Sequence, residues 1–220
     1  MLDAGGWRRD AAGVAALAPS AGEATLRRAM TDPIVRFRRW FREAERAGAP
    51  QPEAMALATS TRNGVPSLRF VLLKQVDPRG FVFFTDARSR KGRELRSNPR
   101  AAATFYWNAL GRQVRIEGKV VELGDAEADA YWVTRPRGSQ LSGATSYQSR
   151  ALASRALLVA RRSALARRYE GRDVPRPAEW RGFRIEPDAI EFWTHKDDRL
   201  HHRQLFRRTG RGWRATLLEP

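Results

Sequence analysis

The chain has 220 residues and no cysteine, which excludes disulfides, thiolate metal ligands and cysteine nucleophiles. Its formal charge of +17 suggests nucleic acid as a partner, but the basic residues are scattered and form no recognised nucleic-acid-binding motif. A surface for small anionic ligands is the favoured interpretation. All three histidines lie between positions 195 and 202 without helical i, i+4 spacing, so we expect no bound metal. No apolar run approaches the roughly 20 residues that span a bilayer, so we expect a cytoplasmic protein without membrane contact.

The N-terminal region divides into a tail and a first helix. Residues 1–26 are rich in alanine and glycine and lack sustained periodicity, which predicts a mobile N-terminal tail before a single domain at 27–220. Asp32 is suited to cap a helix, and Pro33 is suited to its first position. Apolar residues at helical spacing then predict a helix to about residue 47.

The middle of the chain alternates apolar segments with turn signals. Asn63-Gly64 and the four residues 77–80 are typical turn sequences. They predict a meander of short antiparallel strands at 54–60, 66–76 and 81–85. Two more strands are expected at about 101–107 and 112–123. Helices are expected at 88–98, with Ser89 as N-cap, and at 125–134, with Asp125 as N-cap.

The C-terminal third returns to strands after a loop and a helix. Residues 135–150 are polar and are expected to form a loop, and 151–169 an amphipathic helix with a basic face. Strands are expected at 182–186, 189–195, 203–208 and 212–217. About eight short strands with helices around them predict a mostly β protein, a β-barrel with peripheral helices.

The segment Arg69–Lys74 places a strongly apolar run between two cations. The run predicts a buried strand. An unpaired buried cation is costly, so Arg69 and Lys74 must reach solvent or an anion. Because side chains alternate along a strand, the two cations would point to opposite faces. We therefore expect either an irregular strand near Lys74 or two cations that approach ligands from different sides of a dimer interface.

Residues 85–91 join a strand to a helix in a way that suits a phosphate group. Backbone N–H groups at a helix N-terminus, hydroxyls and the cations Arg90 and Lys91 would converge there. Cations are mildly unfavourable in a first helical turn, so their presence indicates an anionic partner, with a solvated basic turn as the alternative.

A second anion-binding group is predicted at residues 131–139. Tyr131 and Arg135 are four residues apart, on one face of the expected helix, and Arg137 and Ser139 follow. Charge-assisted hydrogen bonds from these side chains could hold a second phosphate, the alternative being an ordinary helix end.

Residues 199–203 form a third cluster. In a strand, Arg199, His201 and Arg203 would share a face. Such a row can stack on a flat anionic ring and donate hydrogen bonds to it. A basic hairpin edge is the alternative.

In this order and spacing, the stretches resemble the pyridoxine (pyridoxamine) 5′-phosphate oxidase family from about residue 27 to residue 220. Their joint occurrence is specific, whereas any one alone would be weak. The resemblance is carried by RFVLLK at 69–74, FFTDARSRK at 83–91, NPR at 98–100, RQVRIEGK at 112–119, RPRGSQ at 135–140, QS at 148–149, EFW at 191–193 and RLHHR at 199–203.

The resemblance implies a homodimeric, FMN-binding split β-barrel with FMN at the subunit interface. By matching motif, it implies FMN contacts from Arg69, Val71, Leu72, Lys74, Phe84, Thr85, Arg90, Lys91, Gln113, Gln148, Ser149, Trp193 and Arg203. It implies substrate contacts from Lys74, Tyr131, Arg135, Ser139, Arg199 and His201, of which Arg199 and His201 would be the catalytic residues that orient the substrate ring.

The implied reaction oxidises pyridoxamine or pyridoxine 5′-phosphate to pyridoxal 5′-phosphate, with O2 as acceptor and hydrogen peroxide as product. The flavin would carry the redox chemistry while the protein positions two flat rings. One alternative is an oxidase of the same fold that acts on another aromatic metabolite, as in phenazine biosynthesis. His202 and residues 141–147 depart from the family pattern, but Lys74 and the Arg-Pro-Arg at 135–137 favour a B6 substrate. A basic non-catalytic binding module is the remaining alternative.

Overall fold

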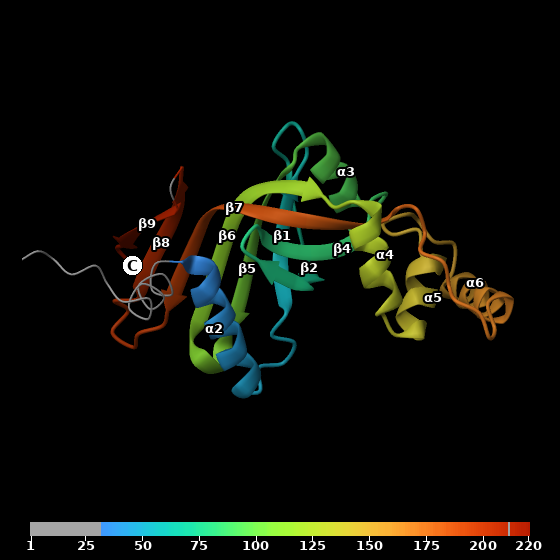
Figure 1. Ribbon diagram of the computed structural model, residues 1–220, viewed down its shortest axis with the longest axis horizontal. Helices are drawn as coiled ribbons and strands as arrows, with labels where there is room; N and C mark the ends of the chain where they lie inside the picture. Colours follow the sequence, from blue (N-terminus) through green and yellow to red (C-terminus); the bar gives the residue numbers. More distant parts are fainter. Residues whose placement is uncertain (1–31, 211) are drawn as a thin grey trace, which may run out of the picture.

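The computed structural model describes residues 32–210 and 212–220, so the tail predicted at 1–26 lies outside the described residues. The described chain is mostly β, and its nine strands form one antiparallel sheet (Figure 1). The strands are β1 (Ala54–Ser60), β2 (Pro66–Leu72), β3 (Gln75–Asp77), β4 (Gly80–Asp86), β5 (Arg100–Trp107), β6 (Arg112–Glu122), β7 (Trp180–Thr194), β8 (His202–Thr209) and β9 (Gly212–Leu218).

Helices lie along the sheet and beyond one of its ends (Figure 1). They are α2 (Pro33–Arg46), α3 (Arg90–Ser97), α4 (Asp125–Val133), α5 (Arg137–Thr145), α6 (Arg155–Arg168) and a short 3-10 helix at Asn108–Leu110. Among the described residues, no helix combines the length and the apolar character needed to cross a bilayer.

Strand β7 organises the sheet, because it changes partner along one edge. The main strand order is β2-β1-β5-β6-β7-β4-β3, and β8 pairs with both β7 and β9. The first half of β7 pairs with β4, with Phe81 opposite Ile185, and the second half pairs with β8, with Phe206 opposite Ile190. This change of partner divides the sheet into the two parts of a split barrel, which confirms the predicted fold class.

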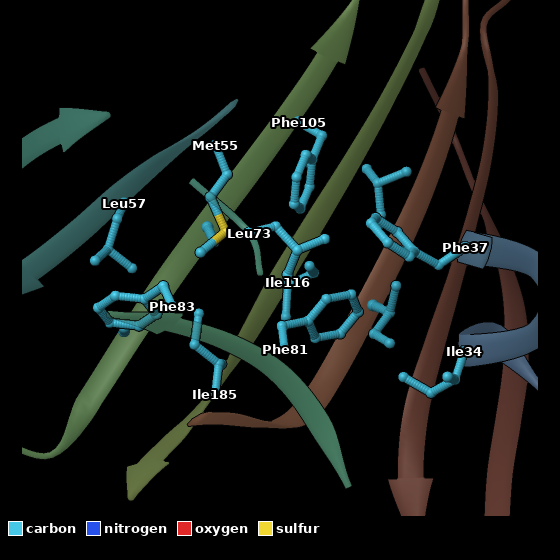
Figure 2. Close-up of a cluster of buried hydrophobic side chains, with 14 of the residues drawn as sticks. Ile34, Phe37, Met55, Leu57, Leu73, Phe81, Phe83, Phe105, Ile116 and Ile185 are labelled. Atoms are coloured by element: carbon cyan, nitrogen blue, oxygen red, sulfur yellow. The ribbon is translucent and has the colours of Figure 1, made fainter. Parts of the chain in front are cut away.

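The core fills the space between α2 and the curled sheet (Figure 2). Asp32 caps α2 by accepting the Ile34 N–H at 2.8 Å, as predicted, and this sets the start of the helix. The ring of Phe37 then packs edge-on against Phe81, with centroids 4.8 Å apart, and lies 5.1 Å from Phe105. Each such fully buried ring stabilises the fold by about 1.5–3 kcal/mol.

The N-terminus of α3 is held tightly against the end of β4. The Ser89 hydroxyl accepts the Gly92 N–H at 3.2 Å, which confirms the predicted cap. A side chain at Gly92 would place its Cβ 2.3 Å from the Ala87 carbonyl oxygen, so only glycine permits this approach. The first turn of α3 is therefore fixed in position relative to the sheet.

The prediction that residues 69–74 form a buried strand is wrong. Strand β2 lies at the edge of the sheet, and Leu68 and Phe70 are 68% and 75% exposed in the single chain. An apolar run does not distinguish a strand buried in its own chain from one that another surface covers. The single strand predicted at 66–76 is also wrong, because β2 ends at Leu72 and Lys74 lies before β3. The alternative expectation of an irregular strand near Lys74 is confirmed.

Three helical predictions need correction. The loop expected at 135–150 contains α5, whose Leu141 packs in a small core beside α4, so tertiary packing overrides its glycine and serine content. Helix α4 is capped by Gly124 without a side-chain bond, and Asp125 is its first residue. Helix α6 begins at residue 155 rather than 151. Within the described chain none of its residues is fully buried, and Leu165 and Ala166 pack against the small core.

Two strand predictions also differ. The strands expected at 182–186 and 189–195 are one continuous strand, β7. The register of its pairing with β6 shifts between the two parts, where Asp188 has no partner on β6. The row expected at 199–203 is not a strand throughout, because β8 begins at His202 and the residues before it form a loop.

Candidate functional site

A cavity of about 440 Å³ opens between the edge of the sheet and the junction of α4 with α5. Most residues predicted to hold FMN or the substrate phosphate line it, together with Phe70, Pro136 and Trp180, which the sequence did not indicate. The lining residues are Phe70, Val71, Leu72, Lys74, Phe84, Thr85, Lys91, Tyr131, Arg135, Pro136, Ser139, Gln148 and Trp180.

Lys91 brings a buried ammonium group to one end of this cavity. Its Nζ donates to the side-chain amide oxygen Oε1 of Gln148 at 2.7 Å and to the Thr85 hydroxyl at 3.1 Å. Close by, the backbone N–H of Arg90 donates to the Ser149 hydroxyl at 3.2 Å. The N-terminus of α3, two hydroxyls and one cation thus lie together, which suits a phosphate group. The guanidinium group of Arg90, the second cation expected here, instead donates to Glu94.

The ammonium group of Lys91 is only partly compensated by the folded chain. Its hydrogen-bond partners among the described residues are neutral oxygens. Burial, and next the positive charge of Arg69, lower the pKa of Lys91 to about 8. An anion in the cavity would offset both effects, since an opposite charge stabilises the ammonium form.

Arg69 does not line the cavity but lies in a polar network beside α3. It donates to the Thr59 hydroxyl at 2.5 Å, to Ser67, and to the Glu94 carboxylate at 3.3 Å. Glu94 is buried and also accepts from Arg90 at 2.8 Å. The sequence did not indicate Glu94, because nothing in its spacing shows that three elements meet around it.

Hydrogen bonding keeps Glu94 ionised. Burial alone would raise its pKa, but hydrogen bonds from Ser67, Thr59, Arg90 and Arg69 lower the pKa of Glu94 to about 2.

The other end of the cavity is an aromatic stack with a guanidinium group beside it. Phe84 stacks on Tyr131 with centroids 4.2 Å apart and on Trp180 at 4.9 Å. The Arg135 guanidinium lies 4.7 Å from the centre of the Trp180 ring, and its NH1 is buried without a hydrogen-bond partner among the described residues. Burial lowers the pKa of Arg135 and raises that of Tyr131. A buried, unpartnered N–H donor of this kind is suited to a bound anion.

Two details of this second anion group differ from the prediction. Helix α4 ends at Val133, so Tyr131 and Arg135 do not share a helix face, although both line the cavity. Arg137 points elsewhere and donates to the carbonyl oxygens of Tyr169 and Arg172.

The remaining predicted residues gather near the junction of β7 and β8. Trp193 lies opposite Gln113 in the β6–β7 pairing, and its ring is 4.6 Å from that of His201. The Lys196 N–H donates to Nδ1 of His201 at 3.1 Å, which leaves Nε2 as the protonated nitrogen of the neutral ring. Arg199 is exposed in the preceding loop with φ +67.

A second buried carboxylate orders this group. Glu191 accepts from Arg203 at 2.8 Å and from Arg115 at 3.0 Å, and it raises the pKa of Arg203. Among the three residues expected to share a strand face, Arg199, His201 and Arg203, only Arg203 lies within a strand, so this prediction is wrong.

The two groups of residues are far apart within one chain. Trp180, at the start of β7, lines the cavity, whereas Trp193, near its end, belongs to the second group. At about 3.3 Å per residue, roughly 40 Å of strand separates them. Figure 1 shows α4 and α5 near one end of the molecule and β8 and β9 at the other. We call the residues between 69 and 149 that line or flank the cavity the cavity group. We call residues 191–203 the β7–β8 group, and Gln113 belongs to this second group because it lies opposite Trp193.

Family comparisons match both parts of this architecture. The family model "Pyridoxamine 5'-phosphate oxidase" matches residues 41–169, and "Pyridoxine 5'-phosphate oxidase C-terminal dimerisation region" matches residues 180–220. The chain belongs to the pyridoxamine 5′-phosphate oxidase family. It is 52% identical to the pyridoxine/pyridoxamine 5′-phosphate oxidase of Rubrobacter xylanophilus, over 98% of this chain and 99% of the relative. The enzyme of the same name from Myxococcus xanthus is 51% identical, over 86% and 92% of the two chains.

Solved structures show the same fold. PhzG from Burkholderia lata, in complex with tetrahydrophenazine-1-carboxylic acid, superposes with a TM-score of 0.83 at 37% identity, covering 86% of this chain and 93% of PhzG. A pyridoxamine 5′-phosphate oxidase-related, FMN-binding protein from Nostoc punctiforme superposes with a TM-score of 0.65. At 15% identity over 93% of this chain and 100% of that protein, this second likeness concerns the fold alone.

Proposed function

We propose that this protein is an FMN-dependent oxidase that converts pyridoxamine or pyridoxine 5′-phosphate to pyridoxal 5′-phosphate as a homodimer. The observation that carries the proposal is that two cations without an anionic partner in the described part of the chain, Lys91 and Arg135, line the same cavity. Lys91 is a buried cation, Arg135 has a buried and unpartnered NH1, and no carboxylate is among the described residues that line the cavity. Two phosphate-bearing molecules, a cofactor and a substrate, would supply the two missing anions.

The donors around Lys91 fit the phosphate of FMN. The ammonium group of Lys91 donates to Thr85 and Gln148, and beside it the backbone N–H of Arg90 donates to Ser149. A phosphate bound here would meet the ammonium group at the N-terminus of α3. Val71 and Leu72 from β2, and Lys74 from the segment between β2 and β3, would lie against the cofactor. Bound FMN would accept the hydride equivalent from the substrate, and O2 would then reoxidise it with formation of hydrogen peroxide.

The donors around Arg135 fit the phosphate of the substrate. The unpartnered NH1 of Arg135 would donate to it, together with Tyr131, Ser139 and Lys74. The neighbouring aromatic stack would exclude water from this end of the cavity and keep the guanidinium group in place. These residues would bind and orient the substrate.

A second copy of the chain would complete the site. The β7–β8 group holds the residues predicted to contact the flavin and the substrate ring, and it lies too far from the cavity to act within one chain. The match to a dimerisation region at residues 180–220 supports a homodimer. Across the interface, Trp193, Gln113 and Arg203 would contact FMN, and Arg199 with the protonated Nε2 of His201 would orient the substrate ring.

The likeness to PhzG supports a second candidate, oxidation of a phenazine precursor. A tricyclic carboxylic acid would also present an anion to Arg135. Relatives at about 50% identity with the B6 oxidase name favour a B6 phosphate, as do Lys74 and the Arg-Pro-Arg sequence at 135–137. The two candidates differ in whether turnover requires a substrate phosphate.

The decisive experiment is an oxidase assay on FMN-loaded protein with pyridoxamine and pyridoxine 5′-phosphates. We expect pyridoxal 5′-phosphate and an equal amount of hydrogen peroxide. Arg199→Ala should lose most turnover and keep FMN, because Arg199 would touch the substrate ring rather than the cofactor phosphate. Arg207→Ala, an exposed arginine on β8, is the matched control. Bound FMN without turnover of either B6 phosphate would reject the substrate assignment, and full turnover by Arg199→Ala would reject the role of Arg199.

A further inference from the structure

We propose that Glu94 is a built-in counter-anion, which occupies Arg69 and Arg90 in the ligand-free protein and competes with the cofactor phosphate for them. The inference rests on the proposed binding of FMN at the N-terminus of α3. It concerns how tightly this chain binds a phosphate, and it implies that the charge of Glu94 weakens FMN binding.

The geometry places one carboxylate among three cations. Glu94 lies on the buried side of α3, one turn after Arg90 and Lys91. Its Oε1 accepts from Nε of Arg90 at 2.8 Å, and its Oε2 lies 3.3 Å from NH2 of Arg69. The two oxygens thus reach arginines from two different elements, α3 and β2.

Hydroxyl groups complete the coordination of this carboxylate. Thr59 and Ser67 each donate to Oε2 of Glu94 at 2.5 Å. With two hydroxyls and two guanidinium groups, the carboxylate has the donors that a phosphate oxygen would seek in the same place. Its low pKa means that the carboxylate remains charged over the whole physiological range.

The contacts of Arg69 favour competition over a purely positioning role. Apart from Glu94, its guanidinium donates to the Leu57 carbonyl oxygen at 3.2 Å and to the hydroxyls of Thr59 and Ser67. These neutral acceptors would keep Arg69 in place without the carboxylate. What Glu94 alone adds to Arg69 is a negative charge, and a negative charge repels a phosphate dianion that approaches the same cations.

The test compares FMN with riboflavin, which has the same ring system but no phosphate. Dissociation constants are measured from flavin fluorescence at low ionic strength for the wild type, for Glu94→Gln and for a control, Glu122→Gln. Glu122, on β6, forms an ion pair at 3.6 Å with Arg96 of α3. Its substitution therefore also removes one ion pair from α3. The Glu94→Gln substitution keeps the shape of the side chain and removes its charge.

We expect Glu94→Gln to tighten FMN binding by about threefold to tenfold, the scale of one pKa unit of charge interaction, and to change riboflavin binding by less than about twofold. The variant without flavin should melt at a lower temperature, because the cations lose their partner. Glu122→Gln should leave the ratio of the two dissociation constants unchanged.

Weaker FMN binding by Glu94→Gln, or an equal change for FMN and riboflavin, would overturn the role of Glu94. A wild type that does not prefer FMN to riboflavin would instead overturn the proposed cofactor site. Should Glu94→Gln fold poorly, Arg90→Gln is compared with the double variant Arg90→Gln/Glu94→Gln, in which one cation and one anion are removed together. The double variant should bind FMN more tightly than Arg90→Gln, and the opposite order would reject the inference.

Discussion

Lys91 illustrates at the residue scale how a folded chain prepares a site for an anion. The side chain is 7% exposed, its hydrogen bonds are to neutral oxygens, and its pKa is lowered to about 8. An ammonium group in this state is stabilised by a phosphate more than a solvated lysine would be, because little water remains to compete. Its protonation should therefore control how tightly the cofactor binds.

The first prediction concerns the pH dependence of FMN binding. The second pKa of a phosphate monoester is about 6, so FMN is a dianion above neutral pH. Above pH 8, Lys91 in the ligand-free protein becomes neutral and must take up a proton when the phosphate binds. We expect the FMN dissociation constant to be nearly constant from pH 7 to 8 and then to rise by up to about tenfold per pH unit. Flavin fluorescence titrations between pH 7 and 9 measure this directly.

The same lysine should affect stability with the opposite sign. Its pKa is about 8 in the folded chain, below the ordinary 10.5, so between these values the unfolded chain binds more protons. The contribution of Lys91 to the free energy of unfolding of the ligand-free protein should therefore rise with pH between these two values. Lys91→Met should bind FMN weakly and should lose both pH dependences. A variant that retained the steep loss of affinity above pH 8 would show that another group is responsible.

At the element scale, β2 combines an open strand edge with exposed apolar side chains. Leu68 and Phe70 are exposed in the single chain, and Phe70 also lines the cavity. An exposed apolar edge of this kind needs a covering surface. In the proposed homodimer the partner would cover β2 and complete the cavity at the same place.

The second prediction tests this edge. Phe70→Asp should convert the dimer to a monomer, because burying the ring contributes about 1.5–3 kcal/mol for each of the two chains and a buried carboxylate is costly. The fold of each chain should persist, since Phe70 is largely exposed within it. Sedimentation gives the assembly state and circular dichroism the fold. Val159→Asp on α6, also an exposed apolar residue, is the control and should remain dimeric. A dimeric Phe70→Asp protein would place the interface elsewhere.

Local chemistry explains which elements the sequence could predict. Asp32 and Ser89 cap their helices through bonds within three residues, so α2 and α3 begin where expected. Strand β2 lies at the edge because it pairs with β1 alone, and α5 forms because Leu141 packs in the small core. Neither contact can be read from the neighbouring residues in the sequence. For the same reason the roles of Glu94 and Glu191 could not be found: Glu94 meets Arg69, and Glu191 meets Arg115, only after segments distant in the sequence have folded together.

At the scale of the whole molecule, the order of motifs predicted a set of residues for one site, and within one chain the structure places them in two separate groups. Residues 84–91 and 131–139 converge in one cavity because β4, α3, α4 and α5 pack around it. The β7–β8 group lies at the other end of β7 (Figure 1). A linear sequence does not state which contacts are made by a second copy of the chain, and an active dimer of this design should depend on one group from each copy.

The third prediction is complementation between two inactive variants. Lys91→Met damages the cavity group and Arg199→Ala damages the β7–β8 group. In a twofold-symmetric mixed dimer, one site carries both substitutions and the other carries neither. Random mixing produces mixed dimers in half of the population, so we expect about one quarter of wild-type turnover from two proteins that are each nearly inactive. The measurement is pyridoxal 5′-phosphate formation after co-refolding at equal amounts.

The matched control mixes two variants of the same group, Lys91→Met and Arg135→Ala. Each site of that mixed dimer takes its cavity group from one damaged chain, so no site is intact and turnover should stay at the level of the separate variants. If both groups acted within one chain, neither mixture would recover activity. Recovery confined to the first mixture therefore requires that β7 carries Trp180 to one active site and Trp193 to the other.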